Sequence, residues 1–202
     1  MAAPIGERER GEPEAHLGLL TIVSARRLPL AAALMAALAE HHPGARRCVI
    51  VTDTIPTGAV LDGDAIAADA LDVPQRAGMR LWYTERELAA ALKPAGFLHL
   101  MFARRLDRVV YLDPATLLLA PLHPVLAALA AHSLVLVPRH LSPAAAAADD
   151  LAVLRGGVHD VGLIAARRNR EGVEFLRRWA ERCRRHCRDD PASGMALDQR
   201  WL

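Results

Sequence analysis

The chain has 202 residues, of which 52% are hydrophobic and 24% charged, which is enough apolar material for one buried core. Its formal net charge of +2 is too small to indicate a nucleic-acid-binding protein. Three cysteines cannot form an even-numbered disulfide framework, and no secretory signal or transmembrane segment is recognisable, so we expect a cytoplasmic protein.

The N-terminal part of the chain predicts a disordered tail followed by a buried strand and a helix. Residues 1–15 are rich in Glu, Arg, Gly and Pro, and they have too little apolar surface to order themselves. The next run, residues 17–23, is mostly apolar and predicts the first strand of a sheet. After a turn, Pro29 stands where the first turn of a helix tolerates proline.

Two further segments precede the centre of the chain. Residues 48–51 form an apolar run that ends on Thr52 and Asp53, and a second strand capped by an acid indicates a parallel sheet. Residues 62–74 alternate small and acidic side chains. From that pattern we expect a short helix and then a strand-like exit at residues 70–73.

A capped helix leads into the central strand. Thr84 and Glu87 have the spacing of a capping box, in which each side chain satisfies a backbone N–H group of the other residue. The helix is expected to restart or kink at Pro94. The strand over residues 109–112 then runs straight into Asp113. Because ligands of open α/β sheets bind outside the carboxyl ends of the strands, Asp113 is better placed for chemistry than the other acids.

The second half of the chain continues the alternation. The expected elements are a helix after Pro124, strands over residues 134–137 and 158–166, and a helix over residues 171–188. Residues 142–150 predict a mobile loop or a short, poorly packed helix. Strand and helix alternate throughout, which favours a single α/β domain.

Four segments, in order, resemble a known family. They read LTIVSARRLPLAAALMAAL, ELAAALKPAGFLHLMFARRLDRVVYLDPATLLLAPL, GGVHDVGLIAARR and EFLRRWAERCRRHCRDDPASGMALDQRWL. Together they are similar to bacterial GT-A fold glycosyltransferases, members of the nucleotide-diphospho-sugar transferase superfamily, and look glycogenin-like. The resemblance implies a Rossmann-like, mostly parallel sheet flanked by helices, in one domain over residues 16–202. It also implies that the chain is incomplete at its C-terminal end.

The resemblance further implies a metal-assisted site. In the family, an Asp-x-Asp motif after the central strand holds a divalent cation, Mn or Mg, that stabilises the leaving diphosphate. Asp113 matches the first carboxylate of that motif, but Ala115 occupies the second position, which removes one expected ligand. Lys93 matches a basic position from which an ammonium group would neutralise phosphate oxygens. A solvated lysine at a helix end explains Lys93 about equally well.

Further residues match the family at positions that contact the nucleotide or the donor sugar. Asp160 stands where the family usually has Asn, and an Asp-Gln pair near the end of the chain would stabilise an oxocarbenium-like transition state. The expected binding residues are Thr21, Ser24, Asp53, Lys93, Asp160 and Gly162, and the expected catalytic residues are Asp198 and Gln199.

The leading hypothesis is transfer of a hexose from a nucleotide-diphospho-sugar to an unknown sugar, lipid or protein acceptor. Likeness to glycogenin-type enzymes favours retention of configuration. The alternative is a catalytically inactive, truncated relative that binds a nucleotide or a partner protein, which Ala115 and Asp160 favour. A third, generic Rossmann-like nucleotide binder is disfavoured because no Gly-x-Gly-x-x-Gly turn follows any expected strand.

Overall fold

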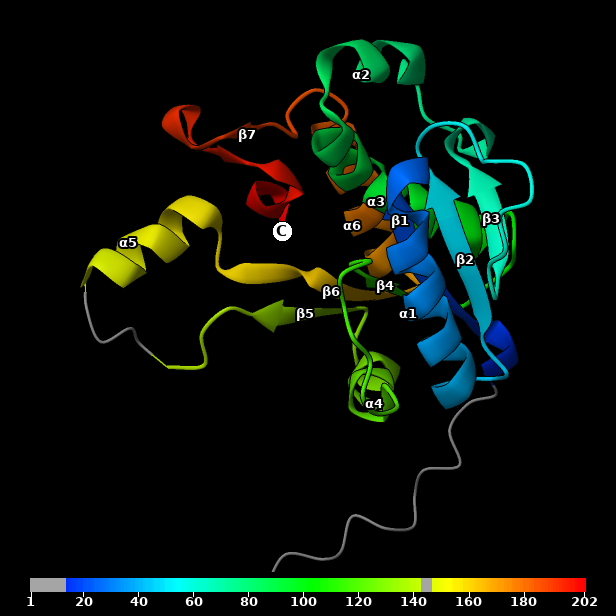
Figure 1. Cartoon of the computed structure of the whole chain (residues 1–202). Helices are drawn as coiled ribbons and strands as arrows, with labels where there is room; N and C mark the ends of the chain where they lie inside the picture. The colour runs from blue at the N-terminus through cyan, green and yellow to red at the C-terminus, as the bar shows by residue number, and fades with distance from the viewer. Residues whose placement is uncertain (1–13, 143–146) are drawn as a thin grey trace, which may run out of the picture.

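A six-stranded sheet with helices on both faces forms the centre of the molecule (Figure 1). The computed structural model describes residues 14–142 and 147–202. The strands, in the spatial order β3-β2-β1-β4-β6-β5, are β1 (Leu17–Val23), β2 (Arg46–Val51), β3 (Asp64–Ala67), β4 (Arg108–Leu112), β5 (Leu134–Pro138) and β6 (His159–Arg167). The first four strands run parallel, and β6 is antiparallel to both β4 and β5. The predicted mostly parallel α/β sheet flanked by helices is confirmed.

The helices divide into two layers because the side chains of each strand alternate between the two faces of the sheet. They are α1 (Leu28–His41), α2 (Arg76–Trp82), α3 (Glu85–Phe102), α4 (His123–Ala131), α5 (Ala147–Gly156) and α6 (Arg170–Cys183). On β1, Leu20 and Ile22 join the core beneath α3 and α6, whereas Leu19 and Val23 join the core beneath α1 and α4. The sheet is therefore buried on both faces, as parallel sheets usually are.

Most of the predicted elements are present near their expected bounds. The apolar runs correspond to β1, β2, β4, β5 and β6, and the helices expected after Pro29 and Pro124 are α1 and α4. The capping box forms, since Thr84 Oγ1 accepts from the Glu87 N–H group and the Glu87 side chain accepts from the Thr84 N–H group. Apolar periodicity and cap chemistry thus identify these elements without tertiary information.

The prediction for residues 62–74 is wrong in its order. The strand comes first, as β3, and a short 3₁₀ helix (Ala68–Ala70) follows it. The small and acidic residues of β3 have little strand propensity of their own. Parallel pairing with β2, which sets Ile50 opposite Ile66, determines the structure here.

The two long helices also differ from expectation. Helix α3 continues through Pro94, so the predicted restart at this proline is wrong, and Leu92 and Phe97 on either side of it are fully buried. Helix α6 ends at Cys183 rather than near residue 188. Beyond it, the Cys187 N–H group donates to the Tyr83 hydroxyl (3.0 Å), so the backbone is held by a side chain near the start of α3 and leaves the helical path.

The two ends of the predicted domain are described to different extents. Most of the predicted tail, residues 1–13, lies outside the described residues, as do residues 143–146 of the predicted loop or helix at 142–150. Glu14 belongs to a short 3₁₀ helix (Glu14–His16), and its carboxylate lies 2.8 Å from Nδ1 of the buried His42. At the other end, the 3₁₀ helix η5 (Leu197–Trp201) packs against α3 and α6, near the C-terminus marked in Figure 1.

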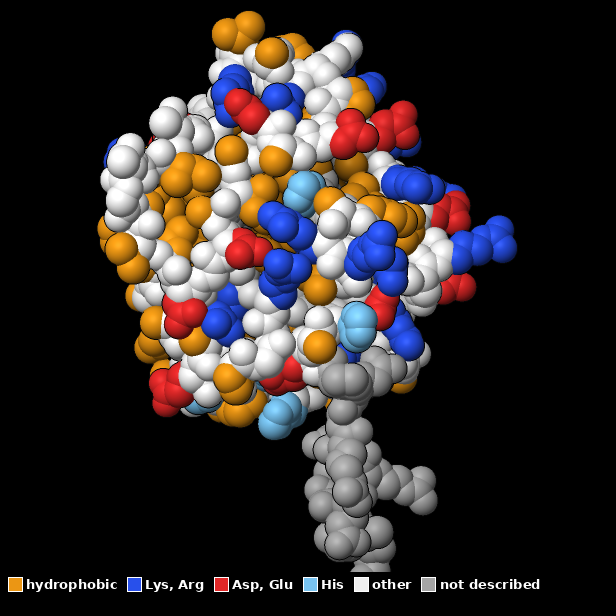
Figure 2. All heavy atoms as spheres, turned by 90° about the vertical axis from the view of Figure 1, so that its right-hand side faces the viewer, with side chains coloured by type: hydrophobic (Ala, Val, Ile, Leu, Met, Phe, Trp, Pro, Cys, Tyr) orange, Lys and Arg blue, Asp and Glu red, His pale blue; other side chains and the backbone are white. Residues whose placement is uncertain are grey.

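The β3 edge of the sheet is covered by charged side chains of both signs. Figure 2 views the molecule from this side and shows basic and acidic side chains intermixed over it. Arg46 pairs with Asp64 (3.2 Å) and Arg47 with Asp62 (2.9 Å). Charged side chains of this kind disfavour pairing of an edge strand with another chain. None of the helices in the two described segments has the length and apolar composition that a bilayer crossing requires.

Candidate functional site

A cleft of about 470 Å³ opens where β1 and β4 end side by side. From β1 the chain crosses to β2 on one side of the sheet, and β4 lies on the other side, so this is the point where the strand order reverses. Crevices at such positions are the usual ligand sites of open α/β sheets. The volume falls within the range of small-molecule sites.

The start of α3 forms one wall of the cleft. Burial alone would raise the pKa of Glu87, but hydrogen bonds from the backbone N–H groups of Thr84 and Asp189 lower it, so the capping carboxylate stays ionised. Glu85, which lines the cleft in the same helical turn, accepts a hydrogen bond from the Ser24 hydroxyl at the end of β1. The cap and this contact hold the first turn of α3 against the end of β1.

Lys93 and Asp198 form a buried ion pair at the base of the cleft. Lys93 Nζ lies 2.9 Å from Asp198 Oδ2, and the two side chains are 6% and 0% exposed. The same ammonium group donates to the Val161 carbonyl oxygen (3.2 Å) and lies 4.8 Å from the centre of the Tyr111 ring. Burial would lower the Lys93 pKa, but the Asp198 carboxylate raises it above its ordinary value, so Lys93 is a permanent cation.

The Asp198 carboxylate makes few directed contacts for a group so deeply buried. Among the described residues, neither of its oxygens has a hydrogen-bond partner, and the 2.9 Å contact with Lys93 is an ion pair. Its backbone oxygen accepts from Nε1 of Trp179 (3.3 Å). The carboxylate therefore borders the cleft with unused acceptor capacity, although both of its oxygens are buried.

Asp113 lies at the carboxyl end of β4, as its position after the strand predicts, and it lines the cleft. Its Oδ1 accepts from the Ala115 N–H group (2.9 Å), which closes a turn directly after the strand. Its own N–H group donates to the Gly162 carbonyl oxygen on β6 (2.7 Å). One carboxylate oxygen of Asp113 thus maintains the turn, and the other accepts no hydrogen bond from a residue in the two described segments.

Asp160 and Gly162 are residues of β6, the strand next to the one that Asp113 follows, but they do not line the cleft. Asp160 is exposed, and its Oδ1 accepts from the Gly162 N–H group (2.6 Å). A Cβ atom on Gly162 would lie 2.8 Å from that oxygen and 3.7 Å from Asp113 Cβ. Glycine therefore permits the close approach of the Asp160 carboxylate to its own strand.

Three other predicted site residues lie outside the cleft. Thr21 is fully buried, and strand alternation places it on the same face as Leu19 and Val23, towards α1. Asp53 accepts from the Ala25 N–H group (2.7 Å) and faces a neighbouring hollow. Gln199 is 8% exposed and uses both ends of its amide internally, accepting from Arg139 and donating to the His159 carbonyl oxygen.

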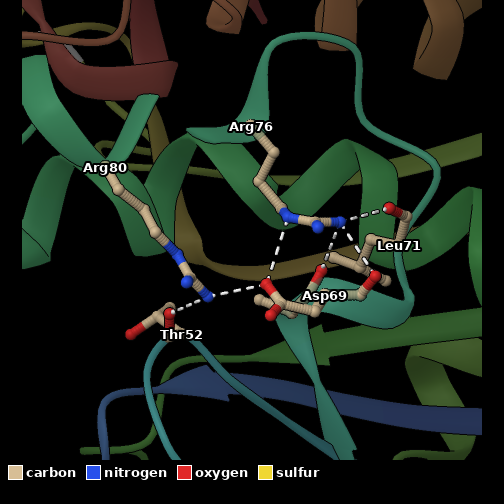
Figure 3. Close-up of polar contacts among 6 residues, drawn as sticks. Thr52, Asp69, Leu71, Arg76 and Arg80 are labelled. Carbon is tan, nitrogen blue, oxygen red and sulfur yellow. Dashed lines mark hydrogen bonds and ion pairs between the residues drawn. The ribbon is translucent and has the colours of Figure 1, made fainter. Parts of the chain in front are cut away.

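The neighbouring hollow, at the ends of β2 and β3, is closed by a network of arginine contacts (Figure 3). Asp69 accepts from Arg80 (2.8 Å) and lies 3.2 Å from Arg76 Nε. Arg80 also donates to the Thr52 carbonyl oxygen, and Arg76 donates to the carbonyl oxygens of residues 68, 69 and 71. Each guanidinium group is thus occupied by protein acceptors.

Sequence reasoning missed two cleft residues, Arg27 and Tyr111. Arg27 precedes α1 and is half-buried, whereas Tyr111 is buried on β4 and forms part of the floor. Burial raises the pKa of Tyr111 to about 12, although the nearby charges of Lys93 and Arg27 act in the opposite direction. The Arg26-Arg27 pair directly after a predicted strand was a usable signal, because that position faces the ligand edge of such sheets.

The residues of the cleft do not fit a metal held by the protein alone. Among residues 14–142 and 147–202, no group of three or more His, Cys, Asp or Glu side chains could hold a metal ion. Asp113 is the only member of the expected acidic motif, and Ala115 offers no ligating side chain. Divalent cations need more oxygen ligands than one carboxylate supplies.

Two solved glycosyltransferase structures have a similar fold. The apo structure of the bifunctional glycosyltransferase WbbM superposes with a TM-score of 0.49 at 14% identity, over 89% of this chain and 35% of that chain. The glycosyltransferase GlyE of Streptococcus pneumoniae TIGR4 superposes with a TM-score of 0.48 at 13% identity, over 92% of this chain and 42% of that chain. The chain thus spans less than half of either structure, and likenesses at this level identify no function. No protein-family model matches the sequence, and no curated protein is detectably similar to it.

Proposed function

We propose that the cleft binds a nucleotide-diphospho-sugar and that the chain is a glycosyltransferase-like protein that transfers a hexose. The observation that carries the proposal is that residues from separate segments line one cleft at the carboxyl ends of β1 and β4. They are Ser24, Lys93, Asp113 and Asp198, all selected from the sequence by the family resemblance.

The chemistry of the cleft suits such a donor. A nucleoside diphosphate leaving group needs positive charge, and Lys93 supplies a permanent, desolvated cation. The Asp198 carboxylate, held by that cation, would accept hydrogen bonds from sugar hydroxyl groups. The reaction would break the bond between the anomeric carbon and the diphosphate oxygen and form a new bond to a hydroxyl oxygen of a sugar, lipid or protein. The nucleoside diphosphate would leave with the bonding electron pair, and the hydroxyl proton would pass to it or to water. Three buried free thiols suit a reducing compartment, so we place the protein in the cytoplasm.

A ligand-binding experiment tests the proposal. We expect nucleoside diphosphates and nucleotide-sugars to raise the melting temperature, since a ligand at a hundredfold excess over its Kd stabilises the folded state by about 2.7 kcal/mol. Ala89 lines the cleft, so Ala89→Phe should abolish this stabilisation. Ala103→Phe is the matched control, because exposed Ala103 caps the far end of the same helix. Equal shifts in both variants, or none in the unaltered protein, would refute the proposal.

A second candidate function is nucleotide-sugar binding without transfer. It is favoured by Gln199, whose amide oxygen accepts from Arg139 and whose amide nitrogen donates to the His159 carbonyl oxygen, and by the pairing of Asp198 with Lys93. Incubation with a bound nucleotide-sugar separates the two candidates. Release of the nucleoside diphosphate above the spontaneous rate supports transfer, whereas saturable binding without release supports the silent relative.

A further inference from the structure

The acidic groups of the described residues are not gathered closely enough near the cleft to hold a divalent cation by themselves. Asp113 uses one oxygen on the Ala115 N–H group (2.9 Å), and Asp160 uses one oxygen on the Gly162 N–H group (2.6 Å). Asp160 also lies outside the lining of the cleft. The positive charge that a diphosphate requires must therefore come largely from elsewhere.

Four basic side chains line the cleft, and three of them already have anionic partners. Arg26 lies 3.3 Å from a Glu85 oxygen, Arg86 lies 2.9 Å from Asp189, and Lys93 lies 2.9 Å from Asp198. The fourth is Arg27. Its guanidinium group makes no hydrogen bond or ion pair with another described residue, although the side chain is only half exposed.

Arg27 lines the same cleft as Asp113. Arg27 ends the turn after β1 and immediately precedes α1, so its backbone is fixed between two regular elements. Its charge acts on the buried phenol of Tyr111, the residue two places before Asp113 on β4. A half-buried cation without a protein partner at this place has the properties of an unfilled anion site.

We propose that Arg27, together with Lys93, binds the diphosphate of the donor in place of a divalent cation. The inference rests on the proposed function, since it assumes that a nucleoside diphosphate occupies the cleft. A guanidinium group offers two parallel N–H donors that match two phosphate oxygens. Lys93 adds a compact charge from the base of the cleft. Together they neutralise the leaving group without the second carboxylate that Ala115 has replaced.

Calorimetric titration in the presence of EDTA, and again with excess Mn²⁺, tests this inference. The probes are ADP, GDP, CDP and UDP, each compared with its nucleoside. The best-bound diphosphate should have similar dissociation constants, within about threefold, in the two buffers. Arg27→Ala should weaken its binding at least about tenfold, the loss expected for a charge-assisted hydrogen bond, and leave nucleoside binding unchanged. Arg27→Lys should lose less, because it keeps the charge.

The controls separate failure of this inference from failure of the proposed function. Arg170→Ala removes an exposed arginine at the opposite edge of the sheet and should bind the diphosphate as the unaltered chain does. A requirement for Mn²⁺ of more than about tenfold, or an Arg27→Ala variant with unchanged affinity, overturns the role of Arg27 and leaves the proposed function standing. If no diphosphate binds in either buffer, the proposed function fails and this inference fails with it.

Discussion

Two neighbouring surfaces at the carboxyl edge of the sheet use their basic residues in opposite ways. In the hollow beyond β2 and β3, Arg76 and Arg80 close on Asp69 and on backbone carbonyl groups (Figure 3). In the cleft beyond β1 and β4, the Arg27 guanidinium group has no partner among the described residues, and Lys93 forms a buried ion pair with Asp198. The first arrangement fixes a loop, whereas the second leaves the Arg27 guanidinium group without a partner within the described segments. The two surfaces therefore differ in how many protein partners each basic side chain has, and not in how many arginines they contain.

The two surfaces also differ in how far their ion pairs are removed from water. The Lys93 and Asp198 side chains are 6% and 0% exposed, whereas the Asp69 side chain is 59% exposed. Removing one partner of a buried pair leaves an uncompensated charge in a low dielectric. Removing one partner of an exposed pair returns the other to water. Substitutions on the two surfaces should thus have very different effects.

The largest effect is expected for Asp198→Ala. It strands the Lys93 ammonium group in the core, so the free energy of unfolding should fall by about 3–5 kcal/mol. Urea denaturation at neutral pH measures this loss. The double variant Lys93→Met with Asp198→Leu removes both charges and should recover most of the stability. A loss below about 1 kcal/mol for Asp198→Ala would mean that the pair is not desolvated in the folded protein.

A smaller effect is expected on raising the pH, and it concerns the floor of the same cleft. Burial raises the pKa of Tyr111 from 10.0 to about 12. Between these values the unfolded chain releases a proton that the folded chain retains, so stability falls as pH rises through this window. The raised pKa of Lys93 acts in the same direction, because above its ordinary value of 10.5 the unfolded chain releases a proton that the folded chain retains.

Replacing Tyr111 with phenylalanine isolates that contribution. Tyr111→Phe removes the titrating hydroxyl, so the free energy of unfolding should decline less steeply between pH 10 and 12, by up to about 1.4 kcal/mol per pH unit. Urea denaturation at several pH values measures the slope for both proteins. Tyr83 provides the reference, because its pKa is also raised to about 12 and it stays in both chains. Identical slopes would show that the Tyr111 hydroxyl is solvated.

The sequence predicts the central strands and the long helices well, because local residue patterns determine them. Continuous apolar runs identify β1 and β4, and the capping box fixes the start of α3. Strand β3 and helix α2 escape prediction because their residues have weak local preferences and depend on pairing with β2 or on tertiary packing. The continuity of α3 through Pro94 is likewise a result of the buried contacts on both sides of the proline.

The site is predicted in part, for equally physical reasons. Ser24 and Asp113 follow strands directly, and the sheet brings the ends of parallel strands together. Thr21 was predicted as a site residue on β1, the strand before Ser24. Because side chains of a strand alternate between its two faces, Thr21 lies on the same face as Leu19 and points towards α1, which the sequence already indicates. The commitment of Gln199 to Arg139 and the isolation of Arg27 depend on contacts between distant segments. No local pattern encodes those contacts.

The smallest effect is expected in the neighbouring hollow, for Asp69→Ala. The change removes the carboxylate shared by Arg76 and Arg80, but both guanidinium groups keep backbone carbonyl acceptors, from residues 68 and 71 and from Thr52. Since the Asp69 side chain is mostly exposed, we expect a loss of less than about 1 kcal/mol, and a smaller loss at high salt. Urea denaturation of the Asp69→Ala and Asp198→Ala variants under the same conditions measures both losses in the free energy of unfolding. If Asp69→Ala were instead as costly as Asp198→Ala, the arginines of the hollow would be as desolvated as Lys93. Burial would then not distinguish the ion pairs of the hollow from the Lys93–Asp198 pair of the cleft.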